Sequence, residues 1–355
     1  MIKIEIWSKV WPVLVAILIF GFIIFIHEFG HFIFAKLFKI KVNQFAIGFG
    51  PAIFKFQKGE TLYALRILPL GGYCAMEGED GKSDDDRAFS KAKVWQRIVV
   101  CAAGAVFNII LGFLILLSVV CIQSNRLAST TISKFDTAAR SQQSGLSVGD
   151  EIIRIGGRRV FSSDDLNYML SLSSDGIVDI TVVRDGEKVE LAGVKFDLEE
   201  YEGHTFIKRD FYVRPIDAGF FGVVKEAFGR TLSMARYIWM SLIDLISGKY
   251  GLSDVSGPVG ITNIMSQAVS SVTSNGVNGL VYLMRILALI TINLGVFNLL
   301  PIPALDGSRI LFLVIEAIRR KPVPPEKEGI VHAVGMAVLM AFMIFIIVKD
   351  VYSLF

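Results

Sequence analysis

The sequence predicts a polytopic α-helical membrane protein with an inserted αβ domain. Of its 355 residues, 53% are hydrophobic and 19% are charged, whereas soluble domains have about 45–50% apolar and about 25% charged residues. The apolar residues are concentrated in blocks of the roughly 20 residues that a membrane helix needs. Between two of these blocks lies a segment with the alternation and turns of a soluble domain. The net charge of +3 is too small to indicate nucleic-acid binding.

Four segments have the length and composition of transmembrane helices. They are residues 11–38, 98–122, 280–318 and 330–348, with approximate bounds. The third segment contains Pro301 and Pro303, which cannot continue a regular helix. We therefore expect the third helix to be broken at membrane depth. Irregular backbone is tolerated there only where it lines a cavity or is buried in protein.

Basic residues predict the orientation of these spans. Many Lys and Arg residues lie between the first two spans, and a second basic cluster, 319–327, lies between the last two. By the positive-inside rule, both connections face the cytoplasm. Both termini and the long segment between the second and third spans are then extracytoplasmic.

Four regions follow from these bounds. They are a first membrane half (1–122), an extracytoplasmic domain (123–205), an amphipathic extracytoplasmic region (206–279) and a second membrane half (280–355). Short β-favouring runs and a hairpin with an Asp185-Gly186 turn make the inserted domain a compact αβ module. In the amphipathic region, charged residues interrupt the apolar stretch 221–246. This pattern favours a helix on the membrane surface over a fifth span.

The connection between the first two spans predicts a membrane-associated β-hairpin region at about residues 45–75. Glycines bound two β-favouring runs there, 52–56 and 62–68. Their mixed apolar character suggests that the hairpins dip into the membrane interface. An extended substrate could pair with an exposed strand edge.

An H-E-x-x-H motif, His27-Glu28-Phe29-Gly30-His31, lies inside the first span. Residues four apart share one helix face, so His27 and His31 can present two imidazoles to one metal ion. Glu28 projects about 100° away around the helix, where it can reach a water molecule at the metal. This arrangement is typical of zinc peptidases that use the glutamate as general base. An ionisable residue at a membrane helix centre costs roughly 2.5–3.5 kcal/mol, which disfavours the alternative of polar residues retained for packing alone.

A catalytic zinc site needs a third protein ligand. The three cysteines are scattered without the spacing of a thiolate site, which leaves nitrogen and oxygen ligands. His204 lies in the insert and His332 at the start of the fourth span, so we expect a carboxylate. Asp306 is the first acidic residue of the third span and directly follows its helix break. The alternatives are that Asp306 caps the following helix and that Glu316 is the ligand.

Four further residues are candidates for substrate-binding or supporting roles. Pro301 and Pro303 form the break in the third span. Asn298 either bonds the backbone freed by this break or holds the substrate backbone near the metal. Asn108 lies in the second span close to Gly104 and supports the site or packs between helices.

These motifs resemble those of a known family. The HEFGH motif, the stretch 298–307 with the pattern N-x-x-P-x-P-x-L-D-G, and the glycine turn at 145–150 closely resemble the site-2 proteases. The closer likeness is to the bacterial RseP/RasP branch, the zinc metalloproteases of regulated intramembrane proteolysis. Further local matches lie at 71–77, 87–89, 104–108 and 256–260, so the resemblance covers nearly the whole chain.

The resemblance implies a Zn²⁺ ion held by His27, His31 and Asp306, with Glu28 activating water. It implies that the insert is a PDZ domain and that the β-hairpin region is a re-entrant element that holds the substrate strand. Implied substrates are single-pass membrane proteins, such as anti-sigma factors already trimmed by an upstream site-1-type protease, and signal-peptide remnants. The chain differs from the family pattern in two features. It has one PDZ domain where proteobacterial members have two, and Ala105 where a proline is common.

Two alternative functions lead to different expectations. A non-enzymatic membrane scaffold with a PDZ-like peptide binder explains the insert but leaves HEFGH and Asp306 without a purpose, and it predicts no stoichiometric zinc. A membrane metalloprotease of another H-E-x-x-H family usually takes a glutamate as third ligand, which favours Glu316 or another residue.

Overall fold

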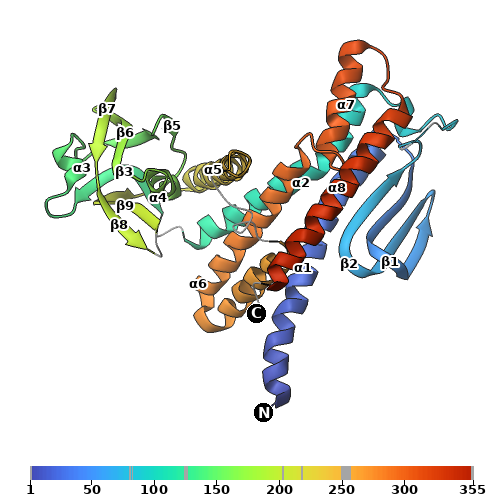
Figure 1. Ribbon diagram of the computed structural model, residues 1–355, viewed down its shortest axis with the longest axis horizontal. Coiled ribbons are helices and arrows are strands. Elements are labelled where there is room, and N and C mark those ends of the chain that lie inside the picture. Colours follow the sequence, from blue (N-terminus) through green and yellow to red (C-terminus); the bar gives the residue numbers. More distant parts are fainter. Residues whose placement is uncertain are drawn as a thin grey trace. The chain divides into compact units, whose positions relative to one another are not determined.

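The computed structural model describes residues 2–79, 81, 83–123, 127–201, 204–216, 219–248 and 257–352. The chain forms two compact units (Figure 1). Unit 1 comprises Met1–Ile115 and Ile238–Phe355, and unit 2 comprises Leu116–Tyr237. Two helices, α2 and α5, contribute residues to both units.

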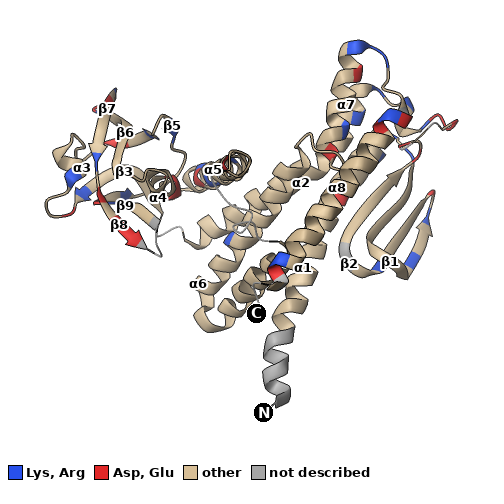
Figure 2. Ribbon diagram, viewed as in Figure 1, with Lys and Arg blue, Asp and Glu red and all other residues tan. Residues whose placement is uncertain are grey.

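Five helices dominate the described part of unit 1. They are α1 (Ile2–Leu37), α2 (Val94–Ile122), α6 (Pro258–Asn298), α7 (Asp306–Arg319) and α8 (Pro325–Tyr352). Within the described residues, four helical segments are long and apolar enough to cross a membrane: Trp11–Leu37, Val94–Ile122, Val259–Asn298 and Glu326–Asp350. Charged residues are sparse along these segments (Figure 2). The prediction of a polytopic membrane protein is therefore confirmed.

The third apolar helix begins earlier than the predicted residue 280. α6 starts at Pro258, but Gly276 interrupts its helical backbone with φ 53° and ψ −125°. The chain turns sharply here. As a result, Gly279 lies so close to Ser271 that a Cβ on Gly279 would be 1.9 Å from the carbonyl oxygen of Ser271. The part that continues toward α7 is therefore 277–298. Helical structure stops at Asn298 and resumes at Asp306.

The connection between α1 and α2 forms one antiparallel hairpin of β1 (Val42–Lys58) and β2 (Thr61–Met76). Both β-favouring runs of the sequence lie in these strands, and several bulges bend them. The base of the hairpin packs on α1, where Phe45 joins the core around Ala35. The two strands also expose large apolar side chains: Phe49, Ile53, Phe54, Phe56, Ile67 and Leu68.

Unit 2 contains a six-stranded sheet in which β10, β3, β4, β6 and β7 follow one another and β5 pairs with β4. Its elements are β3 (Ala128–Phe135), α3 (Arg140–Gln143), β4 (Glu151–Ile155), β5 (Arg158–Arg159), α4 (Ser163–Ser171), β6 (Ile177–Arg184), β7 (Glu187–Lys195), β8 (Asp197–Tyr201), β9 (His204–Lys208), β10 (Phe211–Pro215) and α5 (Phe220–Ile246). β8 and β9 form a separate hairpin. Because β10 pairs with β3, the sheet extends past the predicted boundary at residue 205.

The turn between β6 and β7 has the predicted type I′ character. Asp185 and Gly186 both have positive φ, at 51° and 86°. A type I′ turn requires this conformation at both central residues, and it matches the twist of the flanking strands. Buried aliphatic residues of the sheet, including Ile132, Ile152 and Ile180, form the core of unit 2.

Candidate metal centre

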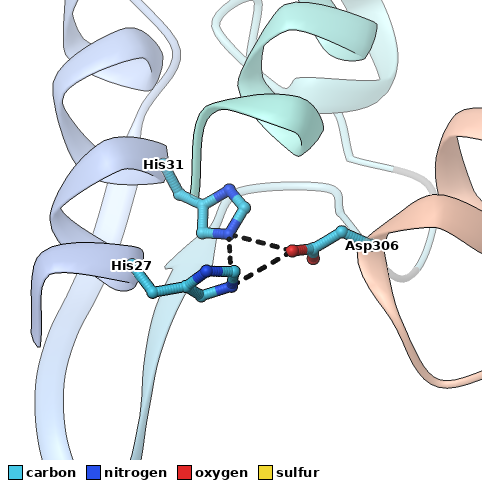
Figure 3. A group of neighbouring side chains, drawn as sticks. All are labelled: His27, His31 and Asp306. Atoms are coloured by element: carbon cyan, nitrogen blue, oxygen red, sulfur yellow. Dashed lines mark hydrogen bonds and ion pairs between the residues drawn. The ribbon is translucent and has the colours of Figure 1, made fainter. Parts of the chain in front are cut away.

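Two elements far apart in the sequence meet at the H-E-x-x-H motif (Figure 3). One turn of α1 presents His27 and His31, which are 8% and 7% exposed. The first residue of α7 presents Asp306, whose Oδ2 lies 3.1 Å from His27 Nε2 and 3.3 Å from His31 Nε2. The two Nε2 atoms are 3.3 Å apart. All three potential ligand atoms lie within 4.8 Å of one another.

Glycines let α2 approach the two histidines closely. A Cβ on Gly104 would lie 2.3 Å from His31 Nε2 and 2.8 Å from His27 Cε1. A Cβ on Gly30 would lie 2.6 Å from the carbonyl oxygen of Ala103. Real Cβ atoms do not come this close to their neighbours, so Gly104 leaves the space in which the imidazoles lie and Gly30 lets the backbones of α1 and α2 pack closely.

Hydrogen bonds to α2 orient both imidazoles. His31 Nδ1 lies 2.8 Å from the carbonyl oxygen of Val100, so this nitrogen carries the proton and Nε2 has a free lone pair. His27 Nδ1 lies 3.3 Å from the side-chain amide of the fully buried Asn108. The Oδ1 of Asn108 has no hydrogen-bond partner among the described residues. Rotating this amide by 180° lets Oδ1 accept from His27 Nδ1–H and satisfies both groups.

These residues fit a zinc ion. With the Asn108 amide rotated, both Nδ1 atoms donate, and the two Nε2 lone pairs and the carboxylate of Asp306 are three acceptors that face one another. Such a group needs a shared cation to be stable in a buried position. Two imidazoles and one carboxylate are a typical donor set for catalytic zinc, with a fourth position left open. Metal-ligating histidines also typically donate their second ring N–H to a carbonyl, a carboxylate or water.

Glu28 lies beside this cluster and is half-buried. Its side chain lies against Gly72 of β2. A Cβ on Gly72 would be only 3.0 Å from Glu28 Cγ. The glutamate is therefore held between the metal-binding turn of α1 and the β-hairpin.

The other predicted residues lie around the helix break. Asn298 is the last residue of α6 and is half-buried. Pro301 is exposed, and Pro303 packs against α8, where a Cβ on Gly335 would be 2.0 Å from Pro303 Cβ. Asp306 is the first helical residue of α7, and the cap position before it is Leu305, without a side-chain cap.

Glu316, the alternative candidate for the third metal ligand, pairs with Arg97 instead. Its carboxylate accepts two hydrogen bonds from the guanidinium of Arg97, at 3.1 Å and 2.5 Å. It does not belong to the cluster of potential ligands. The carbonyl of Val100 and the close approach of Gly104 were not predicted from the sequence, because neither a backbone carbonyl nor a packing glycine has a distinctive motif.

Comparison with known proteins identifies the chain's relatives. Residues 15–342 match peptidase family M50. The chain is 34% identical, over 345 residues, to a protein of Clostridium acetobutylicum named as a candidate zinc metalloprotease, covering 96% of this chain and 97% of the relative. It is 30% identical to the regulator of sigma-W protease RasP of Bacillus subtilis, covering 97% of this chain and 99% of the relative. The zinc metalloprotease RasP of Bacillus licheniformis has the same identity and coverage.

The family match spans nearly the whole chain, and the four apolar helices have the length of membrane spans. The predicted resemblance to the RasP branch is confirmed. The chain belongs to peptidase family M50 and is a site-2-type intramembrane zinc metalloprotease.

Proposed function

We propose that His27, His31 and Asp306 bind the catalytic zinc ion and that Glu28 is the general base for hydrolysis of a peptide bond in a transmembrane segment. One observation carries this proposal: the two imidazoles of α1 and the carboxylate of α7 converge within 4.8 Å. The hydrogen bond to Val100, together with a rotated Asn108 amide that accepts from His27 Nδ1–H, leaves both Nε2 atoms available as ligands.

Different residues of the chain have separate roles in the proposed reaction. Zinc, when bound, polarises the scissile carbonyl and lowers the pKa of a coordinated water toward about 7. Glu28 takes a proton from the attacking water and delivers it to the leaving amine. The side chain of Glu28 lies against Gly72 of β2, beside the metal-binding turn of α1. The hydrogen bonds to Val100 and Asn108 keep the two rings in place.

The β1–β2 hairpin is proposed to hold the unwound substrate strand. A helical substrate hides its carbonyls in hydrogen bonds, and pairing with a strand edge replaces those bonds after unwinding. Two facts support this role. The side chain of Glu28 lies against Gly72 of β2, and the two strands expose large apolar side chains suited to a membrane.

We further propose that α6 and α7 are two parts of one interrupted membrane span. Asn298, Pro301 and Pro303 then shape the non-helical stretch between them and support Asp306 or the substrate backbone. Both termini are proposed to be extracytoplasmic, and the membrane is the bacterial inner membrane. The basic residues between α1 and α2 and between α7 and α8 support this orientation.

The proposed substrates are single-pass membrane proteins, including anti-sigma factors trimmed by an upstream site-1-type protease, and signal-peptide remnants. The name of the Bacillus subtilis relative, a regulator of sigma-W protease, supports a role in sigma-factor control. We propose that the sheet domain of unit 2 is a single PDZ domain on the extracytoplasmic side. Its glycine turn before β4 and its α4 helix support this assignment.

The test uses purified full-length protein and a tagged single-pass substrate in detergent or liposomes. The wild-type protein should cleave the substrate within its membrane segment and contain one zinc ion per chain. In native membranes, Glu28→Gln should retain zinc and trap uncleaved substrates. Cleavage outside the membrane segment, or full activity of Glu28→Gln, would contradict the proposed mechanism.

A further inference from the structure

We propose that His332 of α8 is a positioning residue for Asp306. His332 holds the backbone of Ala304 in a left-handed conformation, and this conformation sets where the chain enters α7 and therefore where the Asp306 carboxylate points. The inference rests on the proposed role of Asp306 as a zinc ligand. It assigns a function to a histidine that lies outside the metal cluster.

Ala304 has an unusual backbone for a residue with a side chain. Its φ is 77°, in the left-handed region that disfavours any residue with a Cβ. Its backbone N–H donates a hydrogen bond to His332 Nδ1 over 3.2 Å. A conformation of this kind persists only where the surroundings hold it. The hydrogen bond from Ala304 to α8 is such a constraint.

His332 lies between residues of α7 and α8. Its side chain is 19% exposed, and Nε2 lies 3.7 Å from Glu328 Oε1, one turn earlier on α8. The ring of Phe312, from α7, is 6.0 Å away between centroids. Gly335 lets α8 press against Pro303, the residue before Ala304. α8 thus contacts two consecutive residues of the non-helical stretch, Pro303 and Ala304.

The stretch from Ala304 to Asp306 transmits this constraint over a short distance. The N–H of Leu305 donates to the carbonyl of Ile302 over 3.1 Å. Ser308 donates to the carbonyl of Leu305 from its backbone and from its hydroxyl, at 3.1 Å and 2.7 Å. Because these hydrogen bonds restrain Leu305 and the first turn of α7, a change in the backbone dihedral angles of Ala304 moves the start of α7. Because Asp306 is only two residues away, its carboxylate moves with it.

The test measures zinc affinity by chelator competition on purified full-length protein, together with kcat and KM for a membrane-tethered substrate. His332→Ala should weaken zinc binding about 10- to 100-fold, the usual loss when a residue that orients a ligand is removed. His332→Asn should restore most of the affinity, because the amide oxygen can replace Nδ1 as acceptor. At saturating zinc, kcat of His332→Ala should recover toward the wild-type value, with KM little changed.

A second variant separates positioning from packing. Glycine adopts positive φ without a steric penalty, so Ala304→Gly should lessen the loss in zinc affinity that His332→Ala causes. Met340→Ala, at an exposed site further along α8, is the control and should bind zinc like the wild type. Equal losses for His332→Ala and His332→Asn, with no compensation by Ala304→Gly, would overturn the inference.

One comparison distinguishes this inference from the proposed function. If Asp306→Ala loses zinc but His332→Ala binds it normally, only the role of His332 is wrong. If Asp306→Ala keeps its zinc, the assigned ligand set is wrong, and the inference fails with it.

Discussion

Gly104 offers a steric test of the metal site that leaves every proposed ligand in place. In Gly104→Ala, the new Cβ would lie 2.3 Å from His31 Nε2 and 2.8 Å from His27 Cε1. Ordinary contacts between such atoms are about 3.5 Å, so the His31 ring must retreat by about 1 Å. That displacement is about half of a zinc–nitrogen bond of roughly 2.0–2.1 Å. The ring cannot make it and still keep its ligand position.

The expected loss follows from the cost of overpacking. Inserting a methyl group into a filled space typically costs about 1–3 kcal/mol. If the added methyl group destabilises only the zinc-bound state by this amount, zinc affinity decreases about 5- to 150-fold. Chelator competition on the purified protein measures this change, and cleavage of a membrane-tethered substrate at fixed free zinc should decrease in parallel.

Gly112→Ala is the matched control on the same helix. Its Cβ would also come within 2.3 Å of a neighbour, but that neighbour is the Cγ1 of Ile292, in the side chain of α6. This variant perturbs helix packing equally closely without touching a histidine, so its zinc affinity should stay near the wild-type value. Wild-type zinc binding and cleavage in Gly104→Ala would refute the packing of α2 against the metal site.

Other perturbations test separate parts of the account. Glu28→Gln should lower cleavage by about 10²- to 10⁴-fold, the usual contribution of a general base, while metal analysis still finds zinc. Asp306→Ala should lose zinc, whereas Glu316→Ala should keep it, because Arg97 holds Glu316; the opposite result would identify Glu316 as the ligand. Removing zinc with a chelator should abolish cleavage reversibly. Burial and a hydrogen bond to Asp165 raise the pKa of Tyr237. An unfolded tyrosine loses its proton near pH 10, whereas the folded protein keeps this proton above that pH. The stability of unit 2 should therefore decrease as pH rises beyond about 10, and Tyr237→Phe should reduce this dependence in alkaline denaturation.

Local patterns in the sequence predicted the three residues that lie within 4.8 Å of one another in the structure. His27 and His31 share a helix face because they are four residues apart, and this relation holds in any helix. Asp306 followed from the shortage of other suitable ligands and from the two prolines before it. The polytopic class followed from hydropathy, since a membrane span requires an uninterrupted apolar helix.

Contacts between distant segments could not be predicted in this way. The carbonyl of Val100 has no side-chain signature, although it orients a histidine 69 positions earlier. The bond between His332 and Ala304 depends on how α8 packs, which hydropathy does not specify. β10 joins the sheet of unit 2 through a long-range pairing with β3, which local turn signals do not indicate.

The ligand set of the zinc ion is the central claim, and an anomalous difference map recorded at the zinc absorption edge tests it directly. The account predicts one strong peak about 2.0–2.2 Å from His27 Nε2, His31 Nε2 and a carboxylate oxygen of Asp306. Loss of the peak in Asp306→Ala crystals would complete the case. A peak bound elsewhere in the chain, or bound to the two histidines with Asp306 out of bonding range, would contradict it.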